Sequence, residues 1–200
     1  LVKIDPRSVG VGQYQHDVDL RKLSRALAAV VESCVNYVGV DVNTASVALL
    51  SYVAGINAAV ARNIVERRER VGPFRSRREL LEVARLGKAT FTQCSGFLRI
   101  RGGEEPLDDT PIHPESYAVA YELLERVGLS AREVARGDVR RLRSSLLPLL
   151  GKDRSSEFEA LARELGVGQP TLRDIMEALL RPGRDPREDL PAPLFRTDVL

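Results

Sequence analysis

Apolar side chains recur every three or four residues along most of this chain, which is the spacing of one buried face of an α-helix. Asp19 is suited to cap a first helix, whose apolar stripe consists of Leu23, Leu27, Val30, Val31 and Val35. Later stripes predict short helices near residues 114–127, 130–135, 138–147, 155–165 and 170–180. Only the first four residues read as a short strand, so we expect an all-α fold.

A near-repeat with an offset of thirty residues occupies residues 43–100. Its matching pairs are Leu50 and Leu80, Val53 and Val83, Ile56 and Leu86, and Ala59 and Ala89. Each copy predicts a short helix, a hairpin and a second helix. Ser76 and Glu79 have the spacing of a capping box, which predicts that a third helix begins there.

The turn in each copy resembles the hairpin of a helix-hairpin-helix motif, in which an apolar residue stands between two glycines. The first hairpin is Gly55-Ile56-Asn57 and the second is Arg85-Leu86-Gly87, so each lacks one glycine. We expect Asn57 to replace its glycine by adopting a left-handed backbone conformation.

A helix that starts from such a hairpin presents unpaired backbone N–H groups and the positive end of its dipole. A phosphate oxygen satisfies both, and a contact of this kind positions a nucleic acid without reading its sequence. The candidate nucleic-acid-binding residues are Gly55, Ile56, Asn57, Ala58, Arg62, Arg85, Leu86, Gly87 and Lys88.

The formal net charge of +2 conceals an uneven distribution of charged residues. Residues 62–101 carry eleven basic and four acidic side chains, whereas residues 102–200 carry fourteen basic and nineteen acidic ones. Such a concentration of positive charge is typical of a surface that meets a polyanion. For any single arginine, including Arg62 and Arg85, an ordinary solvated charge is an equally good interpretation.

Several classes of protein are disfavoured by the composition. No apolar run is long enough to span a membrane, and no signal peptide opens the chain. Cys34 and Cys94 have no neighbouring cysteine or histidine at a ligand spacing, which favours two buried thiols in a reducing cytoplasm. We therefore expect a cytoplasmic chain with no metal, cofactor or catalytic residue. Because Leu1 is not a natural start, we expect an excised piece of a longer protein.

The segments that flank the repeat narrow the interpretation further. They are residues 4–17 (IDPRSVGVGQYQHD), 34–46, 112–117 (IHPESY) and 182–187 (PGRDPR). Together with the repeat, these segments resemble the Tex family of bacterial transcription accessory proteins. The resemblance implies that residues 1–20 end an RNase H-like domain, 21–41 form a connecting helix, 42–103 form a tandem helix-hairpin-helix domain, 104–113 form a linker, 114–181 form a small helical domain, and 182–200 lead towards an S1 domain.

The resemblance also implies the function and partners. We expect a sequence-independent nucleic-acid-binding module, working with RNA or DNA, with RNA polymerase or the transcription machinery, and with the neighbouring domains of a longer protein. The alternative is a helical scaffold that binds no nucleic acid and only joins the RNase H-like and S1 domains and contacts protein partners. The imperfect hairpins are the best argument for that scaffold.

Two other features suggest different chemistry. Asp5, His16 and Asp17 could be the remnant of a nuclease site, but a metal-dependent nuclease needs several converging carboxylates. Residues 159–175, with a glycine turn between two helical stretches, resemble a helix-turn-helix reader of DNA. The acidic side chains in and around this segment repel the phosphates of a nucleic acid, so a scaffold role is favoured for this region.

Overall fold

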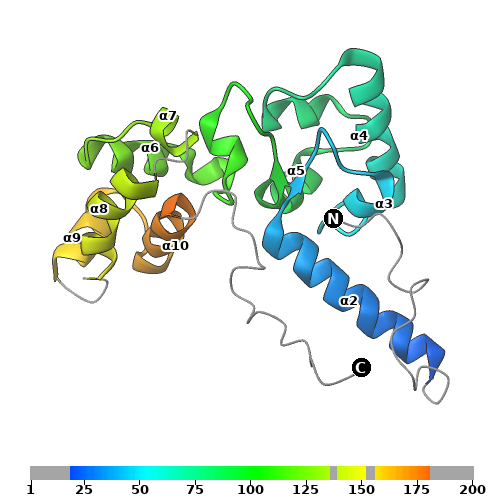
Figure 1. The fold of residues 1–200 in the computed structure, drawn as a ribbon, viewed down its shortest axis with the longest axis horizontal. Coiled ribbons are helices and arrows are strands. Elements are labelled where there is room, and N and C mark those ends of the chain that lie inside the picture. Colours follow the sequence, from blue (N-terminus) through cyan, green and yellow to red (C-terminus); the bar gives the residue numbers. More distant parts are fainter. Residues whose placement is uncertain (1–18, 136–138, 152–155, 181–200) are drawn as a thin grey trace, which may run out of the picture.

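The computed structural model describes residues 19–135, 139–151 and 156–180. Within these ranges the regular structure is almost entirely helical, which confirms the all-α fold expected from the sequence. Figure 1 shows two groups of helices side by side, and each group has its own hydrophobic core. The expected strand at residues 1–4 and the expected extended segment 182–200 lie outside the described residues.

Helix α2 (Leu20–Val38) leads into the first group. It begins as predicted, because the Asp19 carboxylate accepts the backbone N–H of Arg21 at 2.8 Å. It ends at Gly39, which has a φ of 80°. The expectation of a buried apolar stripe is wrong for much of this helix, since Val30 is 60% exposed.

The rest of the first group is formed by short elements. They are β1 (Val40–Asp41), α3 (Val47–Leu50), α4 (Ala58–Val71), the 3-10 helix η1 (Arg77–Glu82), α5 (Lys88–Cys94), the 3-10 helix η2 (Ser95–Phe97) and β2 (Leu98–Arg99). Strands β1 and β2 pair in parallel, with Val40 opposite Leu98. The predicted third helix is therefore a 3-10 turn rather than an α-helix.

The capping box predicted before η1 is displaced by one residue at both ends. Ser76 accepts the N–H of Arg78 at 3.2 Å, and Glu79 accepts the N–H of Arg75 at 3.1 Å.

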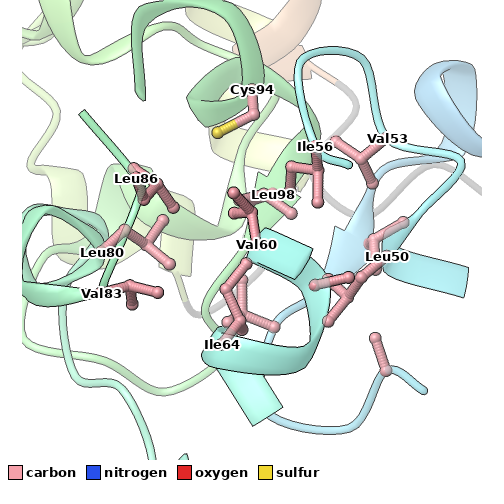
Figure 2. Packing of buried hydrophobic residues seen from close by; sticks show 14 of the residues in the cluster. Leu50, Val53, Ile56, Val60, Ile64, Leu80, Val83, Leu86, Cys94 and Leu98 are labelled. Atoms are coloured by element: carbon pink, nitrogen blue, oxygen red, sulfur yellow. The ribbon is translucent and has the colours of Figure 1, made fainter. Parts of the chain in front are cut away.

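The core of the first group includes three of the four repeat pairs, whereas Ala59 and Ala89 lie outside it. Its side chains point towards one another (Figure 2). The residues labelled there are Leu50, Val53, Ile56, Val60, Ile64, Leu80, Val83, Leu86, Cys94 and Leu98. All ten are buried, and burying one aliphatic side chain stabilises a fold by about 1.5–3 kcal/mol. The two copies therefore fold around a single shared core.

The second group contains the five helices expected from the sequence, preceded by two 3-10 turns. The elements are η3 (Pro106–Asp109), η4 (Pro114–Ser116), α6 (Tyr117–Arg126), α7 (Ala131–Ala135), α8 (Val139–Leu150), α9 (Ser156–Glu164) and α10 (Gln169–Leu180). Helix α10 contributes most to its core, because Leu172, Ile175, Met176, Leu179 and Leu180 are buried.

The segment between the two groups, residues 104–113, is folded and packed. Asp108 and Thr110 are each only 1% exposed. The side chain of Arg77, also 1% exposed, donates to the carbonyl oxygens of Thr110 at 2.6 Å and Ile112 at 2.7 Å. The segment predicted as a linker is therefore a packed joint between the two groups, while the domain boundaries themselves stay predictions.

Candidate nucleic-acid interface

The first hairpin has a left-handed residue at its start and a capped helix at its end. Gly55 has a φ of 82°, and the side chain of Ile56 is buried in the core. Asn57 has a φ of −90°, so the left-handed conformation expected for it is wrong. Its side-chain oxygen instead accepts the N–H groups of Ala59 and Val60, both at 3.0 Å. Asparagine serves here because it caps α4.

The second hairpin repeats the backbone shape but leaves its helix uncapped. Arg85 takes the left-handed position with a φ of 67°, and Leu86 is buried. Gly87 precedes α5 and offers no side chain to cap it. A Cβ atom added at Gly87 would meet no atom within 4 Å, so the space in front of this helix is open.

The two hairpins hold each other in place across the repeat. A Cβ atom at Gly55 would lie 2.8 Å from the Cβ of Gln93 on α5. In the mirrored contact, the side-chain amide of Asn63 on α4 donates to the carbonyl oxygen of Ala84 at 2.6 Å. Since residues 63 and 93 are related by the thirty-residue offset, each hairpin rests on the second helix of the other copy.

Some of the arginines in residues 62–101 interact with other groups of the protein and are not available to a ligand. Arg67 donates to Glu79 at 2.7 Å and lies 4.4 Å from the centre of the Phe74 ring, while Arg68 donates to the carbonyl oxygen of Val42 at 2.6 Å. The basic count in the sequence therefore overstates the charge available to a ligand.

Three of the predicted cations remain available near the hairpins. Arg62, Arg85 and Lys88 are exposed, and none of their side chains has a hydrogen bond or ion pair with another described residue. Arg62 adjoins Asn63, the α4 residue that contacts Ala84, and Arg85 and Lys88 flank Leu86 and Gly87. The structure thus leaves Arg85 and Lys88 exposed in the second hairpin, and Arg62 exposed on α4, the helix that contacts this hairpin through Asn63.

Two protein families match separate parts of the chain. The helix-hairpin-helix motif family matches residues 35–99, and a second family, described as an HHH domain, matches residues 105–187. The transcriptional accessory protein Tex of Neisseria gonorrhoeae is 49% identical over 187 residues, which cover 94% of this chain and 23% of that protein. The chain belongs to the Tex family.

Other relatives of this Tex-family chain come from a wide range of organisms. Protein YhgF of Escherichia coli (strain K12) is 48% identical over 199 residues, which cover all of this chain and 24% of that protein. The human S1 RNA-binding domain-containing protein 1 is 34% identical over 249 residues, again covering all of this chain and 24% of the relative. The chain therefore spans about a quarter of the length of these relatives.

The second family match reveals hairpins that the sequence interpretation missed. Residues 128–130 (Gly-Leu-Ser) join α6 to α7, and residues 166–168 (Gly-Val-Gly) join α9 to α10. Gly128 and Gly166 have φ values of 70° and 67°, as at the start of the first two hairpins. Residues 166–168 have the complete glycine, apolar, glycine pattern, so the signal was present in the sequence and was assigned instead to a helix-turn-helix.

Other kinds of site find no support within the described ranges of this Tex-family chain. No group of three or more histidine, cysteine or acidic side chains there could hold a metal ion. None of the helices described is both long and apolar enough to cross a bilayer. Asp5, His16 and Asp17, the residues considered as a nuclease remnant, lie outside the described residues.

Proposed function

We propose that this chain is a non-catalytic, sequence-independent nucleic-acid-binding module of a transcription accessory protein, and that its second hairpin is the main contact to phosphate. The observation that carries the proposal is the open helix start at Gly87, which the unpaired cations Arg85 and Lys88 flank in the chain. Contact with RNA polymerase and with neighbouring domains, and action in the cytoplasm, belong to the same proposal.

The backbone amides distinguish the two hairpins. The N–H groups of Lys88, Ala89 and Thr90 have no acceptor among the described residues, whereas Asn57 occupies two of the equivalent groups in the first hairpin. Free amides at a helix start, together with the helix dipole, form a site for a phosphate oxygen. We infer that the first hairpin mainly supports the second.

The conformation of Arg85 is a second argument for the same hairpin. A residue with a Cβ atom in the left-handed region costs about 1–2 kcal/mol relative to a glycine, and such strain is often found at functional sites. Here the strained position carries an exposed guanidinium beside Leu86 and Gly87. A cation at this position can reinforce a phosphate held by the amides.

The relatives give the proposal its biological context. One is named a transcriptional accessory protein and another an S1 RNA-binding domain-containing protein. The rival function, a scaffold that binds no nucleic acid, is favoured by the cap at Asn57 and by the internal use of several arginines. The two functions predict different results for one substitution.

Gly87→Asp tests the proposal directly. The carboxylate would occupy the free amides and repel phosphate, so we expect binding of fluorescent single- and double-stranded RNA and DNA to fall by roughly tenfold or more. The variant should stay folded, since Gly87 has an ordinary φ of −80° and open space around it. An aspartate cap should even add a few tenths of a kcal/mol to the free energy of unfolding.

Two matched variants control for charge and for capping. Gly87→Asn caps α5 without adding charge, and Asn57→Asp adds the same charge at the hairpin that is already capped. We expect Gly87→Asn to weaken binding less than Gly87→Asp, and Asn57→Asp to have the smallest effect. Absence of binding by the unaltered chain at low salt would favour the scaffold, and so would an affinity that does not change with salt.

A further inference from the structure

A large cleft lies between the two groups of helices, with a volume of about 1860 Å³. One wall comes from the end of α2, from α3 and from the paired strands, and the other comes from α8 and α10. Among its lining residues, Arg99 on β2 is unusual, because it is only 8% exposed and has no ion pair with any described residue. A buried, unpaired cation calls for a partner.

One side of the Arg99 guanidinium is fixed by the protein. Its Nη1 atom donates to the carbonyl oxygen of Gly96 at 2.6 Å and to that of Leu98 at 3.2 Å. A Cβ atom at Gly39 would lie 2.8 Å from Cζ and 2.9 Å from both Nε and Nη2. Because these three distances are nearly equal, the Cβ position lies above the plane of the guanidinium group. Gly39 therefore packs on the flat face of Arg99.

The remaining edge of Arg99, formed by Nε and Nη2, has no acceptor in the described part of the chain. Every fully buried side-chain nitrogen or oxygen that the structure describes has a hydrogen-bond partner, so these two nitrogens are not fully buried, and Arg99 lines the cleft. This edge carries two parallel N–H groups and fits the two oxygens of a phosphate. It is held in place before any ligand arrives.

The neighbouring carboxylates do not form an ion pair with Arg99 in the described part of the chain, although the charge of Asp109 acts on it. Asp109 lies in the same wall but is paired with Arg101, with 3.9 Å between Oδ1 and Nε. Asp41 accepts the N–H of Asn43 at 2.9 Å. Burial and the charge of Arg77 lower the pKa of Arg99 to about 9, and the charge of Asp109 offsets only part of that shift.

The cleft begins next to the first hairpin. Asn36, one of its lining residues, accepts the N–H of Ala54 at 3.0 Å, immediately before Gly55.

The opposite wall carries Asp174 and Glu177, and Glu177 is paired with Arg173 at 3.0 Å. Acidic groups on that wall disfavour a duplex but can accept hydrogen bonds from the amino groups of bases.

We propose that Arg99 binds one backbone phosphate of a single-stranded nucleic acid that continues from the hairpins into the cleft, through paired hydrogen bonds from Nε and Nη2. This assignment rests on the proposed function and adds to it a second, preformed phosphate contact and a preference for single strands. The bases of the strand lie towards α8 and α10, where apolar residues such as Leu147 and Ile175 line the cleft.

Arg99→Gln tests this contact, with Arg101→Gln as the matched control in the same wall. We expect Arg99→Gln to weaken binding of a fluorescent single-stranded oligonucleotide roughly tenfold and to reduce the slope of log K against log salt by about 0.7. Arg101 is exposed and already paired with Asp109, so Arg101→Gln should change the affinity and the salt slope less. Binding of duplexes should be nearly unchanged in both variants.

A second measurement does not depend on the stability of the variant. In the unaltered chain, the Nε–Hε resonance of Arg99 in an NMR spectrum should shift when the single-stranded oligonucleotide is added. An unmoved resonance in a chain that binds the strand would overturn the assignment, and so would an unchanged salt slope in folded Arg99→Gln. If a polyglutamate peptide moves the resonance and the oligonucleotide does not, the site takes carboxylates and the assignment to phosphate is wrong.

The outcomes separate this inference from the proposed function. If the unaltered chain binds no nucleic acid, both fail. If it binds and Gly87→Asp abolishes binding while Arg99→Gln has no effect, only the contact at Arg99 fails.

Discussion

The two cysteines show how different the surroundings of one residue type are in this chain. Cys94 is buried in the first core, as predicted, whereas Cys34 on α2 is exposed, so the prediction of a buried thiol is wrong there. Burial raises the pKa of Cys94 to about 12, above its ordinary value of 9.0. The exposed thiol of Cys34 and the buried thiol of Cys94 should therefore differ in their reactivity.

The raised pKa of Cys94 predicts a pH dependence of stability. Between about pH 9 and 12 the unfolded chain releases a thiol proton that the folded chain keeps, so this thiol removes stability as the pH rises, by up to about 1.4 kcal/mol per pH unit. Arg99 has the opposite effect in this range, because its pKa is lowered to about 9. The informative quantity is therefore the difference between variants, measured by urea unfolding.

We expect the free energy of unfolding of Cys94→Ala to fall less steeply above pH 9 than that of the unaltered chain. Cys34→Ala is the control, and its pH profile should parallel that of the unaltered chain. At pH 8 a thiol-specific reagent should label Cys34 rapidly and Cys94 only after unfolding. Parallel profiles for both variants would contradict the assignment of the shift to Cys94.

The conformation of Asn57 marks the limit of what the sequence predicts at this scale. An asparagine tolerates both a left-handed backbone and an N-cap position, and only the surrounding chain decides between them. Arg85 is the reverse case, since its left-handed backbone is imposed by the shape of the hairpin. The sequence located the candidate residues but did not show which of them offer free amides.

At the scale of the element, the hairpins are four copies of one turn. Each begins with a left-handed residue, at Gly55, Arg85, Gly128 and Gly166, with φ values between 67° and 82°. Apolar periodicity predicted the helices on both sides to within a few residues, because burial of one face dominates their formation. The 3-10 geometry of η1 was not predictable, since it depends on how Arg77 and Leu80 are buried against later segments.

Gly55→Ala should show how tightly the first hairpin is held. The new Cβ atom would lie 2.8 Å from the Cβ of Gln93, and the alanine would have to adopt the left-handed φ of 82° that Gly55 has. We expect a loss of roughly 2–4 kcal/mol in the free energy of unfolding, measured with urea. Gly87→Ala, with open space and an ordinary φ, is the control and should change stability by less than about 0.5 kcal/mol.

The contact with Gln93 can be tested in the same experiment. Combining Gly55→Ala with Gln93→Gly removes the opposing Cβ atom, so part of the lost stability should return beyond the sum of the two single changes. Strictly additive losses would show that the left-handed backbone alone makes Gly55 necessary.

At the scale of the whole molecule, Arg77 joins the two groups of helices. Its side chain belongs to the first group, yet it donates to Thr110, Ile112 and the hydroxyl of Tyr117, the last at 2.6 Å. Its backbone N–H donates to Asp108 at 2.7 Å. The sequence predicted a turn-rich linker here because the segment is acidic and polar, and no local pattern shows that a distant arginine fills it.

We expect Arg77→Met to destabilise both groups together. Removing the guanidinium leaves the carbonyl oxygens of Leu98, Thr110 and Ile112 and the hydroxyl of Tyr117 without their donor. It also removes the cation 3.9 Å from the buried carboxylate of Asp108, and the loss should cost about 3–5 kcal/mol. Hydrogen exchange followed by mass spectrometry should show faster exchange in α4 and in α6. Arg78→Met, at the exposed neighbouring position, should leave both unchanged, and faster exchange confined to α4 would contradict the role of Arg77 as a joint.

The buried joint also bears on how such proteins can be rearranged in evolution. Residues 100–104 separate the two family matches, and a genetic crossover there would divide one from the other. A recombinant with only the first half would leave the guanidinium N–H groups of Arg77 without their acceptors in the second half. A recombinant with only the second half would leave those acceptor oxygens without a donor. The two hairpin pairs are therefore expected to be passed on as one indivisible block.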